Sequence, residues 1–227
     1  MWLSGGTCRL CGDPAAQGQG ADLCAGCLAD LPRNHHACDA CGLPLSGNGS
    51  QVCSRCQQHP PPWDAPITPF VYASPIDYFI RRLKFAEDLS AAGLLAALAR
   101  PALCSLAPDL LIPVPLHASR LRRRGFNQAQ QIARPLGRQL GITVDAHSCR
   151  RIIATPEQSR LSARARRRNL RGAFECRRDL QGLHVAVVDD VMTTGSTTAE
   201  FSRVLRKAGA RRISICCIAR VPPFSQA

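Results

Sequence analysis

Cysteine dominates the N-terminal quarter of the chain. Eight of the thirteen cysteines lie in the first 56 residues, arranged as four C-x-x-C pairs. Two residues between two thiolates let a tight turn present both sulfurs to one tetrahedral Zn²⁺, and two such turns complete a set of four ligands. The pattern therefore predicts two zinc sites. Their ligands are Cys8, Cys11, Cys24, Cys27, Cys38, Cys41, Cys53 and Cys56.

Four thiolates per ion leave no ligand position for a substrate, so both zinc ions are predicted to be structural. The spacing alone leaves open whether neighbouring pairs share an ion or the pairs interleave. Few large apolar residues lie between the pairs, and we expect this region to depend on its metal for folding. His35, His36 and His59 lie close by, but the cysteines alone fill both sites.

A disulfide framework is the alternative use of these cysteines. The N-terminal sequence MWLSGGTCRLCG has no basic region followed by an apolar stretch, so nothing in it directs the chain to a secretory route. No segment approaches the roughly 18 uninterrupted apolar residues of a membrane span. We therefore expect a soluble, cytoplasmic protein with no membrane span. Because thiols are kept reduced in that compartment, zinc is favoured over disulfides.

A proline-rich connector, HPPPWDAP at 59–66, follows the cysteine-rich region. It predicts a double zinc ribbon at 1–62 and a second domain at 63–227. Helical and strand-like patterns alternate in the second domain, which indicates an α/β fold with a mostly parallel sheet flanked by helices. The expected elements are a helix at 74–100, a strand at 109–115, a helix at 126–141 interrupted at Pro135, a strand at 183–190, a helix at 196–209 and a strand at 211–220.

The segment VAVVDDVMTTGST, at 185–197, joins a buried strand to two acids and a glycine among hydroxyl side chains. In a parallel sheet it lies at the carboxyl end of a strand, where ligands collect. Asp189 and Asp190 can accept hydrogen bonds from ribose hydroxyls or hold a hydrated Mg²⁺, and the following loop can bind a phosphate. A sugar phosphate is therefore expected; a helix cap after two surface acids is the alternative. The expected phosphate-binding residues are Thr193, Thr194, Gly195, Ser196 and Thr197.

The formal net charge of +13 comes from one segment of the chain. Between 116 and 178 there are sixteen arginines and only three acids, an excess equal to that of the whole chain. Guanidinium groups suit bidentate contacts with phosphates, so the cluster favours a polyanion such as single-stranded DNA. Codon bias together with a solvated basic face is the alternative. The predicted polyanion contacts are Arg122, Arg123 and Arg124.

Two resemblances extend this interpretation. A strand, an acid pair and T-T-G-x-T resemble the type I phosphoribosyltransferases, whose ligand is phosphoribosyl pyrophosphate (PRPP). The motifs RRLKF (81–85), IPVPLHASRLRRRGFNQA (112–129) and TPEQSRLSARARRRNLRGAF (155–174), behind four C-x-x-C pairs, resemble the ComF family of ComFC and GntX-type proteins. This second resemblance covers nearly the full chain. It implies a zinc-ribbon region before a phosphoribosyltransferase domain, and a role in natural competence, in which imported single-stranded DNA is handled.

The resemblance to phosphoribosyltransferases also implies roles for individual residues. Asp189 and Asp190 would bind the ribose 2′ and 3′ hydroxyls of PRPP, which Mg²⁺ accompanies, and the hydroxyl-rich loop would bind the 5′-phosphate. The implied pyrophosphate loop comprises Leu116, His117, Ala118, Ser119 and Arg120. The implied flexible loop, which closes over PRPP, contains Gln158, Arg166 and Asn169.

Three functions remain open at this point. The chain is a phosphoribosyltransferase with an unknown acceptor, a DNA-binding protein that uses PRPP as a regulatory ligand, or a zinc-ribbon adaptor for a partner such as a DNA-uptake helicase. Thr193 stands where some base-salvage relatives carry an Asp that accepts a proton from the base, so the general base is unassigned. The other cysteines are expected to be buried structural thiols. These are Cys104, Cys149, Cys176, Cys216 and Cys217.

Overall fold

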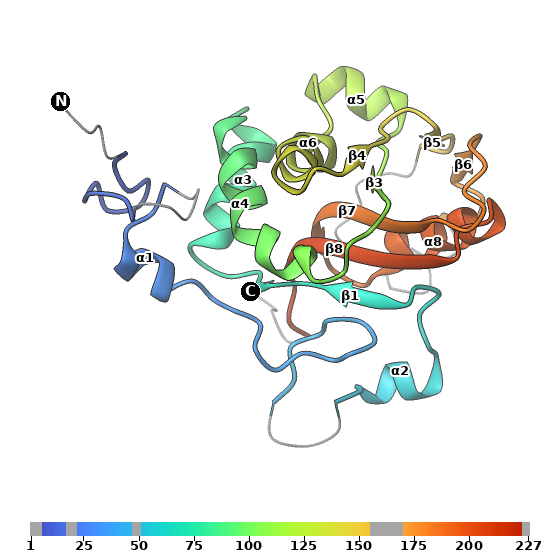
Figure 1. Ribbon diagram of the computed structural model, residues 1–227, viewed down its shortest axis with the longest axis horizontal. Coiled ribbons are helices and arrows are strands. Elements are labelled where there is room, and N and C mark those ends of the chain that lie inside the picture. Colours follow the sequence, from blue (N-terminus) through green and yellow to red (C-terminus); the bar gives the residue numbers. More distant parts are fainter. Residues whose placement is uncertain (1–5, 17–21, 47–50, 155–169, 224–227) are drawn as a thin grey trace.

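A parallel β-sheet forms the centre of the molecule (Figure 1). The computed structural model describes residues 6–16, 22–46, 51–154 and 170–223. The strand order is β1-β8-β7-β3-β4, β2 also pairs with β8, and all these pairings are parallel. The strands are β1 (Ala65–Ile67), β2 (Phe70–Val71), β3 (Leu110–Pro113), β4 (Thr143–Val144), β7 (His184–Met192) and β8 (Arg212–Arg220).

Helices cover both faces of this sheet, which explains why β7 is apolar at consecutive positions. Ala186 and Val188 of β7 face a core shared with three helices, whereas Val185 and Val187 face a second core that includes α8. The helices of the first core are α3 (Ile76–Phe85), α4 (Ser90–Cys104) and α6 (Gln128–Leu140); α8 spans Ser196–Lys207. The predicted alternation of helices and parallel strands is confirmed.

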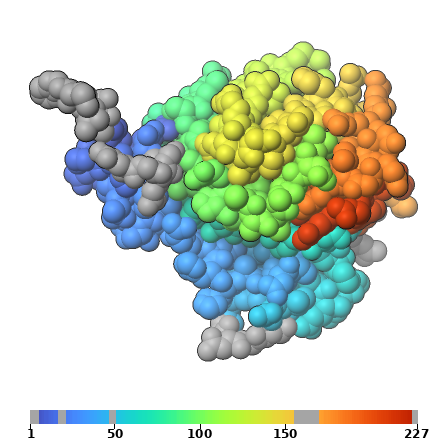
Figure 2. All heavy atoms as spheres, viewed as in Figure 1, coloured from blue at the N-terminus to red at the C-terminus, as the bar shows by residue number. Residues whose placement is uncertain are grey.

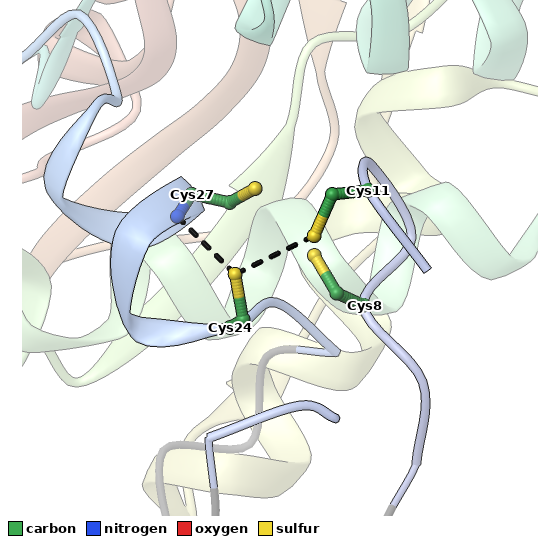
Figure 3. Close-up of side chains that lie close together, drawn as sticks. All are labelled: Cys8, Cys11, Cys24 and Cys27. Atoms are coloured by element: carbon green, nitrogen blue, oxygen red, sulfur yellow. Dashed lines mark hydrogen bonds between the residues drawn. The ribbon is translucent and has the colours of Figure 1, made fainter. Parts of the chain in front are cut away.

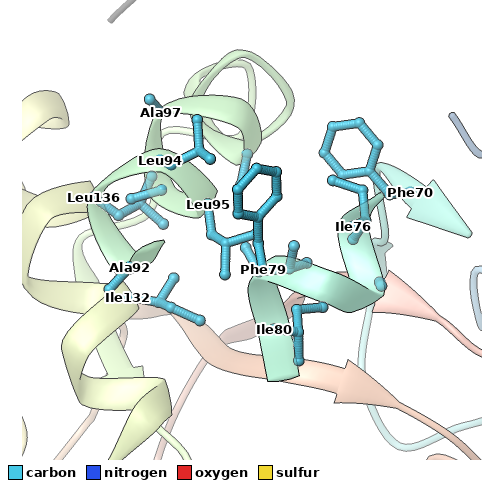
Figure 4. Packing of buried hydrophobic residues seen from close by; sticks show 14 of the residues in the cluster. Phe70, Ile76, Phe79, Ile80, Ala92, Leu94, Leu95, Ala97, Ile132 and Leu136 are labelled. Atoms are coloured by element: carbon cyan, nitrogen blue, oxygen red, sulfur yellow. The ribbon is translucent and has the colours of Figure 1, made fainter. Parts of the chain in front are cut away.

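The first core is built mainly from helix-to-helix packing (Figure 4). Phe79 and Ile80 of α3, Leu95 of α4 and Ile132 of α6 are fully buried and converge on one another. Burying a side chain of this size contributes about 1.5–3 kcal/mol. This packing fixes α3 against the sheet. It thereby positions Lys84, which α3 contributes to the candidate site.

The expected single helix at 74–100 is wrong. The chain forms two helices, α3 and α4, separated at 86–89. Glu87 has a φ of 53°, which no helix can continue through. The Asp88 side chain then accepts hydrogen bonds from Ser90 Oγ and from the N–H of Ala91 (3.3 Å), and so caps the start of α4.

The expected interruption at Pro135 is also wrong, because α6 runs without a break from Gln128 to Leu140. Ile132 and Leu136, on either side of the proline, are fully buried, and this packing outweighs the one backbone hydrogen bond that proline removes. The helix ends as predicted at Gly141, whose φ of 69° is in the left-handed region.

The zinc-ribbon region wraps around one side of the sheet domain (Figure 2). It contains two short helices, α1 (Ala25–Ala29) and α2 (Ser54–Gln58). Cys8, Leu23 and Leu28 belong to the same core as α3 and α4, whereas Cys38 and Cys56 belong to the core around α8. Each half of the region therefore packs on a different face of the α/β part. No helix within the described ranges combines the length and apolar character that a membrane crossing needs.

A separate antiparallel hairpin, β5 (Cys149–Arg151) with β6 (Phe174–Cys176), lies beside α8. The turn that leads into β5 is held by Asp145, whose side chain accepts hydrogen bonds from the N–H groups of His147 and Ser148. Arg178 pairs with the same carboxylate at 3.0 Å. Asp145 therefore links the segment that precedes β5 to the segment that follows β6.

Asp145 makes the stability of this region sensitive to acid. Burial raises the pKa of Asp145, but the Ser148 and His147 N–H groups and Arg178 lower it further, to about 2. A lowered pKa stabilises the fold above the unfolded value of 3.8, and that stability is lost as the pH falls toward 2. Urea unfolding at several pH values should show Asp145→Asn destabilised by about 1–2 kcal/mol at neutral pH, with the difference vanishing near pH 2. A constant difference would contradict this assignment.

Candidate functional site

The acid pair lies near the carboxyl end of β7. Asp190 is buried, with 3% of its surface exposed, and its side chain forms an ion pair with Lys84 of α3. Asp189 is half-buried, and its carboxylate accepts the N–H of Asp190 at 2.9 Å. β7 continues through the acids to Met192, two residues beyond the predicted end of the strand. The acids are thus held by the rigid sheet rather than by a loop.

Burial determines the electrostatics of the pair. Desolvation, followed by the charge of Asp190, raises the pKa of Asp189 well above its ordinary value of 3.8. Burial would lower the pKa of Lys84, but Asp190 and then Asp189 raise it above 10.5. One half-buried cation thus faces two carboxylates. This arrangement favours a ligand that brings hydroxyl donors or a further cation.

Lys84 was not predicted as a site residue. It is one of only two lysines in a chain rich in arginine, and it lies within the RRLKF motif. These two features of the sequence could have indicated a role in the site. The pairing itself depends on the packing of α3 on the sheet, which no local pattern reports.

Removing the lysine should destabilise the protein strongly. Lys84→Met leaves Asp190 buried without its partner, a change that typically costs about 3–5 kcal/mol. Arg81→Met, on an exposed position of the same helix, should change stability by less than about 0.5 kcal/mol. Chemical denaturation at neutral pH measures both. A raised lysine pKa contributes stability that is present below 10.5 and is lost in alkali, so the difference should shrink as the pH rises above 10.5. Equal stability of the two variants would refute the role of the pair.

The hydroxyl-rich loop follows β7 and leads into the N-terminus of α8. Gly195 has a φ of 72°, and a Cβ there would lie 3.2 Å from the Trp63 ring. Thr194 Oγ1 and Ser196 Oγ lie 2.9 Å apart. Thr193 is exposed and Thr197 half-buried. The loop therefore brings hydroxyls and the free N–H groups of a twelve-residue helix to one place, as an anion requires.

Two buried side chains connect this loop to the second zinc ribbon. Arg220, at the end of β8, is 3% exposed and donates to the carbonyls of Met192 (2.9 Å) and Thr193 and to that of Cys41 (3.2 Å). Trp63 lies against Gly195 and donates its indole N–H to the carbonyl of Ala40 at 2.8 Å. The C-x-x-C turn at 38–41 therefore supports the hydroxyl-rich loop through both side chains. Sequence reasoning assigned a role to neither.

A basic group lies at the same end of the sheet, after β3. Leu116 and His117 follow the strand, but Ala118, Ser119 and Arg120 form the first turn of a helix, α5 (Ala118–Arg124), rather than a loop. His117 Nδ1 accepts the N–H of Ser119 at 3.2 Å and caps this helix. The cluster Arg122, Arg123 and Arg124 forms its last turn.

Arg151, at the end of β5, extends the basic group toward the acid pair. It forms an isolated bridge with His117, and its guanidinium lies 5.5 Å from the centre of the Phe174 ring. Burial and then Arg120 lower the pKa of Arg151, whereas Asp189 opposes the shift. Arg151 therefore lies between a cation and an acid of the expected site, and sequence reasoning missed it among its fifteen neighbouring arginines. The expected flexible-loop residues Gln158, Arg166 and Asn169 lie outside the described residues.

The eight N-terminal cysteines form two groups of four, and consecutive pairs share each group. In each group the sulfur atoms all lie within 4.8 Å of one another. Figure 3 shows the four side chains of the first group gathered together. The N–H groups of Cys27 and Cys53 donate to Cys24 Sγ and Cys38 Sγ. The groups are Cys8, Cys11, Cys24 and Cys27, and Cys38, Cys41, Cys53 and Cys56. This resolves the open question of pairing in favour of neighbouring pairs.

The chemistry of both groups fits zinc. Burial raises the pKa of Cys8, but backbone N–H groups lower it further, to about 6. The same opposing effects lower the pKa of Cys38 to about 7. Neighbouring sulfurs raise the pKa of Cys27, because four thiolates this close repel one another unless a cation lies between them. Two closed four-cysteine sites support structural zinc, as predicted.

Comparisons with known proteins identify a family for each of the two parts of the chain. Residues 2–57 match a family model described as double zinc ribbon domain, and residues 121–223 match one described as phosphoribosyl transferase domain. A purine phosphoribosyltransferase from Pyrococcus horikoshii aligns with 66% of this chain and 78% of its own at 23% identity, with a TM-score of 0.38. The predicted phosphoribosyltransferase-type α/β domain beside a zinc-ribbon module is confirmed by the family models and the parallel sheet.

Full-length relatives are also known. The DNA utilization protein YhgH of Salmonella typhi is 38% identical over 222 residues, which cover 95% of this chain and 97% of the relative. Competence protein F of Haemophilus influenzae is 36% identical over 87% of this chain and 90% of its own length. Competence protein ComFC of Bacillus subtilis is 25% identical over 82% and 79%.

Proposed function

The chain belongs to the family of competence protein F and the DNA utilization protein YhgH, and on that premise we propose that it binds PRPP with Mg²⁺ and acts on single-stranded DNA during natural competence. One observation carries the PRPP assignment. The acid pair, the left-handed Gly195 and the start of α8 lie in succession at the carboxyl end of a buried parallel strand. This order supplies hydroxyl acceptors and then phosphate donors along one path.

In this proposal each group of the site has one task. Asp189 and Asp190 accept the ribose 2′ and 3′ hydroxyls, and the ion pair with Lys84 holds the Asp190 side chain in place. The 5′-phosphate binds to the hydroxyl-rich loop, at the residues Thr193, Thr194, Gly195, Ser196 and Thr197. The pyrophosphate binds near His117, Arg120 and Arg151, where Arg151 interacts electrostatically with both Arg120 and Asp189. Gln158, Arg166 and Asn169 remain the proposed closing loop, and Leu116, Ala118 and Ser119 complete the pyrophosphate segment.

A transferase reaction at this site would displace pyrophosphate from C1 of the ribose. Mg²⁺, when bound, supplies positive charge to the departing diphosphate. The arginines stabilise the same charge, and the acid pair and the phosphate loop hold the ribose in line with a nucleophile. Thr193 offers no proton acceptor at the position used by base-salvage enzymes. Regulatory binding of PRPP without turnover is therefore the alternative function of this site.

Ligand-dependent stabilisation tests the PRPP assignment. PRPP with Mg²⁺ should raise the melting temperature, because a ligand that binds only the folded state stabilises it by mass action. Ribose 5-phosphate and pyrophosphate, each of which occupies half of the site, should give smaller shifts at the same concentration. An equal shift from pyrophosphate alone would indicate a general anion site instead. Pyrophosphate release that appears only when single-stranded DNA is added would establish turnover.

A surface beside the acid pair supports the DNA assignment. Phe85 follows Lys84 at the end of α3 and is 74% exposed, and the Arg124 guanidinium lies 5.9 Å from the centre of its ring. Tyr78, on the same helix, is exposed beneath Arg82. Exposed aromatic rings beside arginines bind unpaired bases by stacking while the cations contact the phosphates. The proposed polyanion contacts Arg122, Arg123 and Arg124 adjoin this surface on α5.

The stacking role of Phe85 is testable with two probes of equal charge. The protein should bind oligo(dT) more tightly than an abasic strand of the same length, and Phe85→Leu should lose about tenfold of its oligo(dT) affinity while binding the abasic strand unchanged. Phe85→Trp, which restores an aromatic face, should retain the preference. The salt dependence of binding should be the same in all three proteins, because no charge changes. If Phe85→Leu keeps the full preference, Phe85 does not stack on bases.

The remaining assignments complete the proposal. We place the protein in the cytoplasm, where incoming single strands and PRPP are both present, with the domain boundary at 62/63. The zinc ribbons are the candidate docking surface for a helicase of the uptake machinery. Because Arg220 and Trp63 connect the second ribbon to the hydroxyl-rich loop, we assign the helicase contact to the first ribbon.

A further inference from the structure

Two cysteines that are far apart in sequence lie opposite each other in the β5–β6 hairpin. Cys149 pairs in register with Cys176. The N–H of Arg177 donates to the carbonyl of Ser148 at 2.9 Å, so the hydrogen bonds flank the cysteine pair and do not join it. In antiparallel sheets such a pair has its Cα atoms about 4.5 Å apart and its side chains at their closest. That separation is within the range in which a disulfide forms, about 4.4–6.8 Å.

The two thiols differ in their surroundings. Cys149 is buried, with 5% of its surface exposed, and burial followed by the neighbouring Cys176 raises its pKa. Cys176 is half-buried, its Sγ lies 3.5 Å from the carbonyl of Arg178, and it lines a cavity of about 780 Å³ between the hairpin and α8. Arg171 and Arg203 line the same cavity. A small oxidant therefore reaches Cys176 before it reaches the buried Cys149.

We propose that Cys149 and Cys176 form a site of reversible oxidation, at which a peroxide converts the thiol pair into a cross-strand disulfide. The Cys176 thiol gives up its proton and its sulfur attacks one peroxide oxygen; the O–O bond breaks, the leaving hydroxide takes up that proton as water, and the sulfur becomes a sulfenic acid. The Cys149 thiol then attacks that sulfur, the S–O bond breaks, and the Cys149 proton leaves with the hydroxyl group as water. Two thiols lose two electrons and one peroxide becomes two waters.

This differs from the expectation that both are buried structural thiols. Cys176 is accessible, and the two residues form a pair that their spacing in the sequence does not reveal. A disulfide here would join covalently the two strands that carry Arg151 and Phe174, next to Asp189. Oxidation would thus restrain the hairpin that brings a basic group to the candidate site. The thiol chemistry itself does not depend on the proposed PRPP binding.

Peptide mapping of the full zinc-loaded chain tests the proposal. The protein is treated with hydrogen peroxide, its free thiols are alkylated, and it is digested with trypsin without reduction. Cys149 lies in the tryptic peptide 139–150 and Cys176 in 172–177. The expected product is these two peptides linked, two hydrogen atoms lighter than their sum, and separated again by dithiothreitol. Zinc content measured in parallel should stay unchanged, which shows that the ribbon thiols did not react.

Serine variants assign the roles and exclude random cross-linking. Cys104→Ser removes an exposed cysteine on α4 and should leave the linked product unchanged. In Cys149→Ser the sulfenic acid on Cys176 has no resolving thiol, so dimedone should label peptide 172–177. In Cys176→Ser neither the link nor a label on Cys149 should form. Overoxidation of Cys176 to sulfinic acid in the parent protein while Cys149 stays alkylated, or a link from Cys176 to Cys104, would overturn the proposal.

Discussion

Asp189→Asn is expected to lower the affinity for Mg²⁺-PRPP by roughly tenfold to a hundredfold and to raise the stability of the free protein. With Asp190, the Asp189 carboxylate is proposed to accept the ribose hydroxyls, and one hydrogen bond to a charged acceptor contributes about 1.5–3 kcal/mol. The pKa of Asp189 is raised in the folded protein. The stability that this carboxyl group contributes is therefore fully present below pH 3.8 and is lost as the pH rises through its pKa in the folded state. Removing the carboxyl group should therefore raise the free energy of unfolding at neutral pH. Titration calorimetry and thermal unfolding measure the two effects.

Asp189→Asn should weaken PRPP binding while it stabilises the fold, which makes it more informative than a variant with alanine at both Asp189 and Asp190. Asp190 is the buried partner of Lys84, so removing it disturbs the fold as well as the ligand site. Asp189→Asn leaves that ion pair in place. A stable Asp189→Asn protein with unchanged PRPP affinity would remove the acid pair from the ligand site altogether.

Loss of the second zinc ion is expected to weaken PRPP binding, whereas loss of the first is not. Cys53→Ser and Cys11→Ser each remove one ligand and should each reduce the zinc content from about two ions to about one per chain. Only the second ribbon provides the carbonyls of Ala40 and Cys41, to which Trp63 and Arg220 donate. Without zinc these carbonyls lose their fixed positions, and the hydroxyl-rich loop loses its support. We expect a drop in PRPP affinity of about tenfold or more in Cys53→Ser alone.

Zinc analysis by mass spectrometry and a PRPP titration of both variants provide the measurement. Arg220→Met is the companion variant, because it breaks the same connection without touching a zinc ligand. It should retain two zinc ions and show the affinity loss of Cys53→Ser, while Arg212→Met at the exposed start of β8 should bind PRPP normally. Equal affinities in Cys11→Ser and Cys53→Ser would mean that the second ribbon does not support the loop.

Local patterns were sufficient for the parts of the fold that depend on nearest neighbours. The apolar runs of β7 and β8 and the glycine stop of α6 follow directly from period and turn chemistry. The break between α3 and α4 was missed because helix-favouring residues surround it. The capping Asp88 before Ser90 was a usable signal that the continuous pattern outweighed.

Only the part of the site that is contiguous in sequence could be predicted. The acid pair and the hydroxyl-rich loop are contiguous, so one motif contains both. Lys84, Arg151 and Arg220 reach the site from α3, β5 and β8, and only the packing of these elements brings them together. The cysteine spacing likewise predicted four-thiolate sites, but the choice between neighbouring and interleaved pairs depends on how the two ribbons fold over different faces of the sheet.

Isothermal titration calorimetry of the zinc-loaded wild-type protein with PRPP in the presence of Mg²⁺ tests the central claim most directly. The account predicts saturable binding of one PRPP per chain, which is weakened in Asp189→Asn and when Mg²⁺ is withheld. No detectable heat at several temperatures, together with no competition between PRPP and any labelled ligand of the wild type, would contradict it. The acid pair and loop would then be a retained scaffold, and the arginines and the exposed Phe85 would be the functional surface.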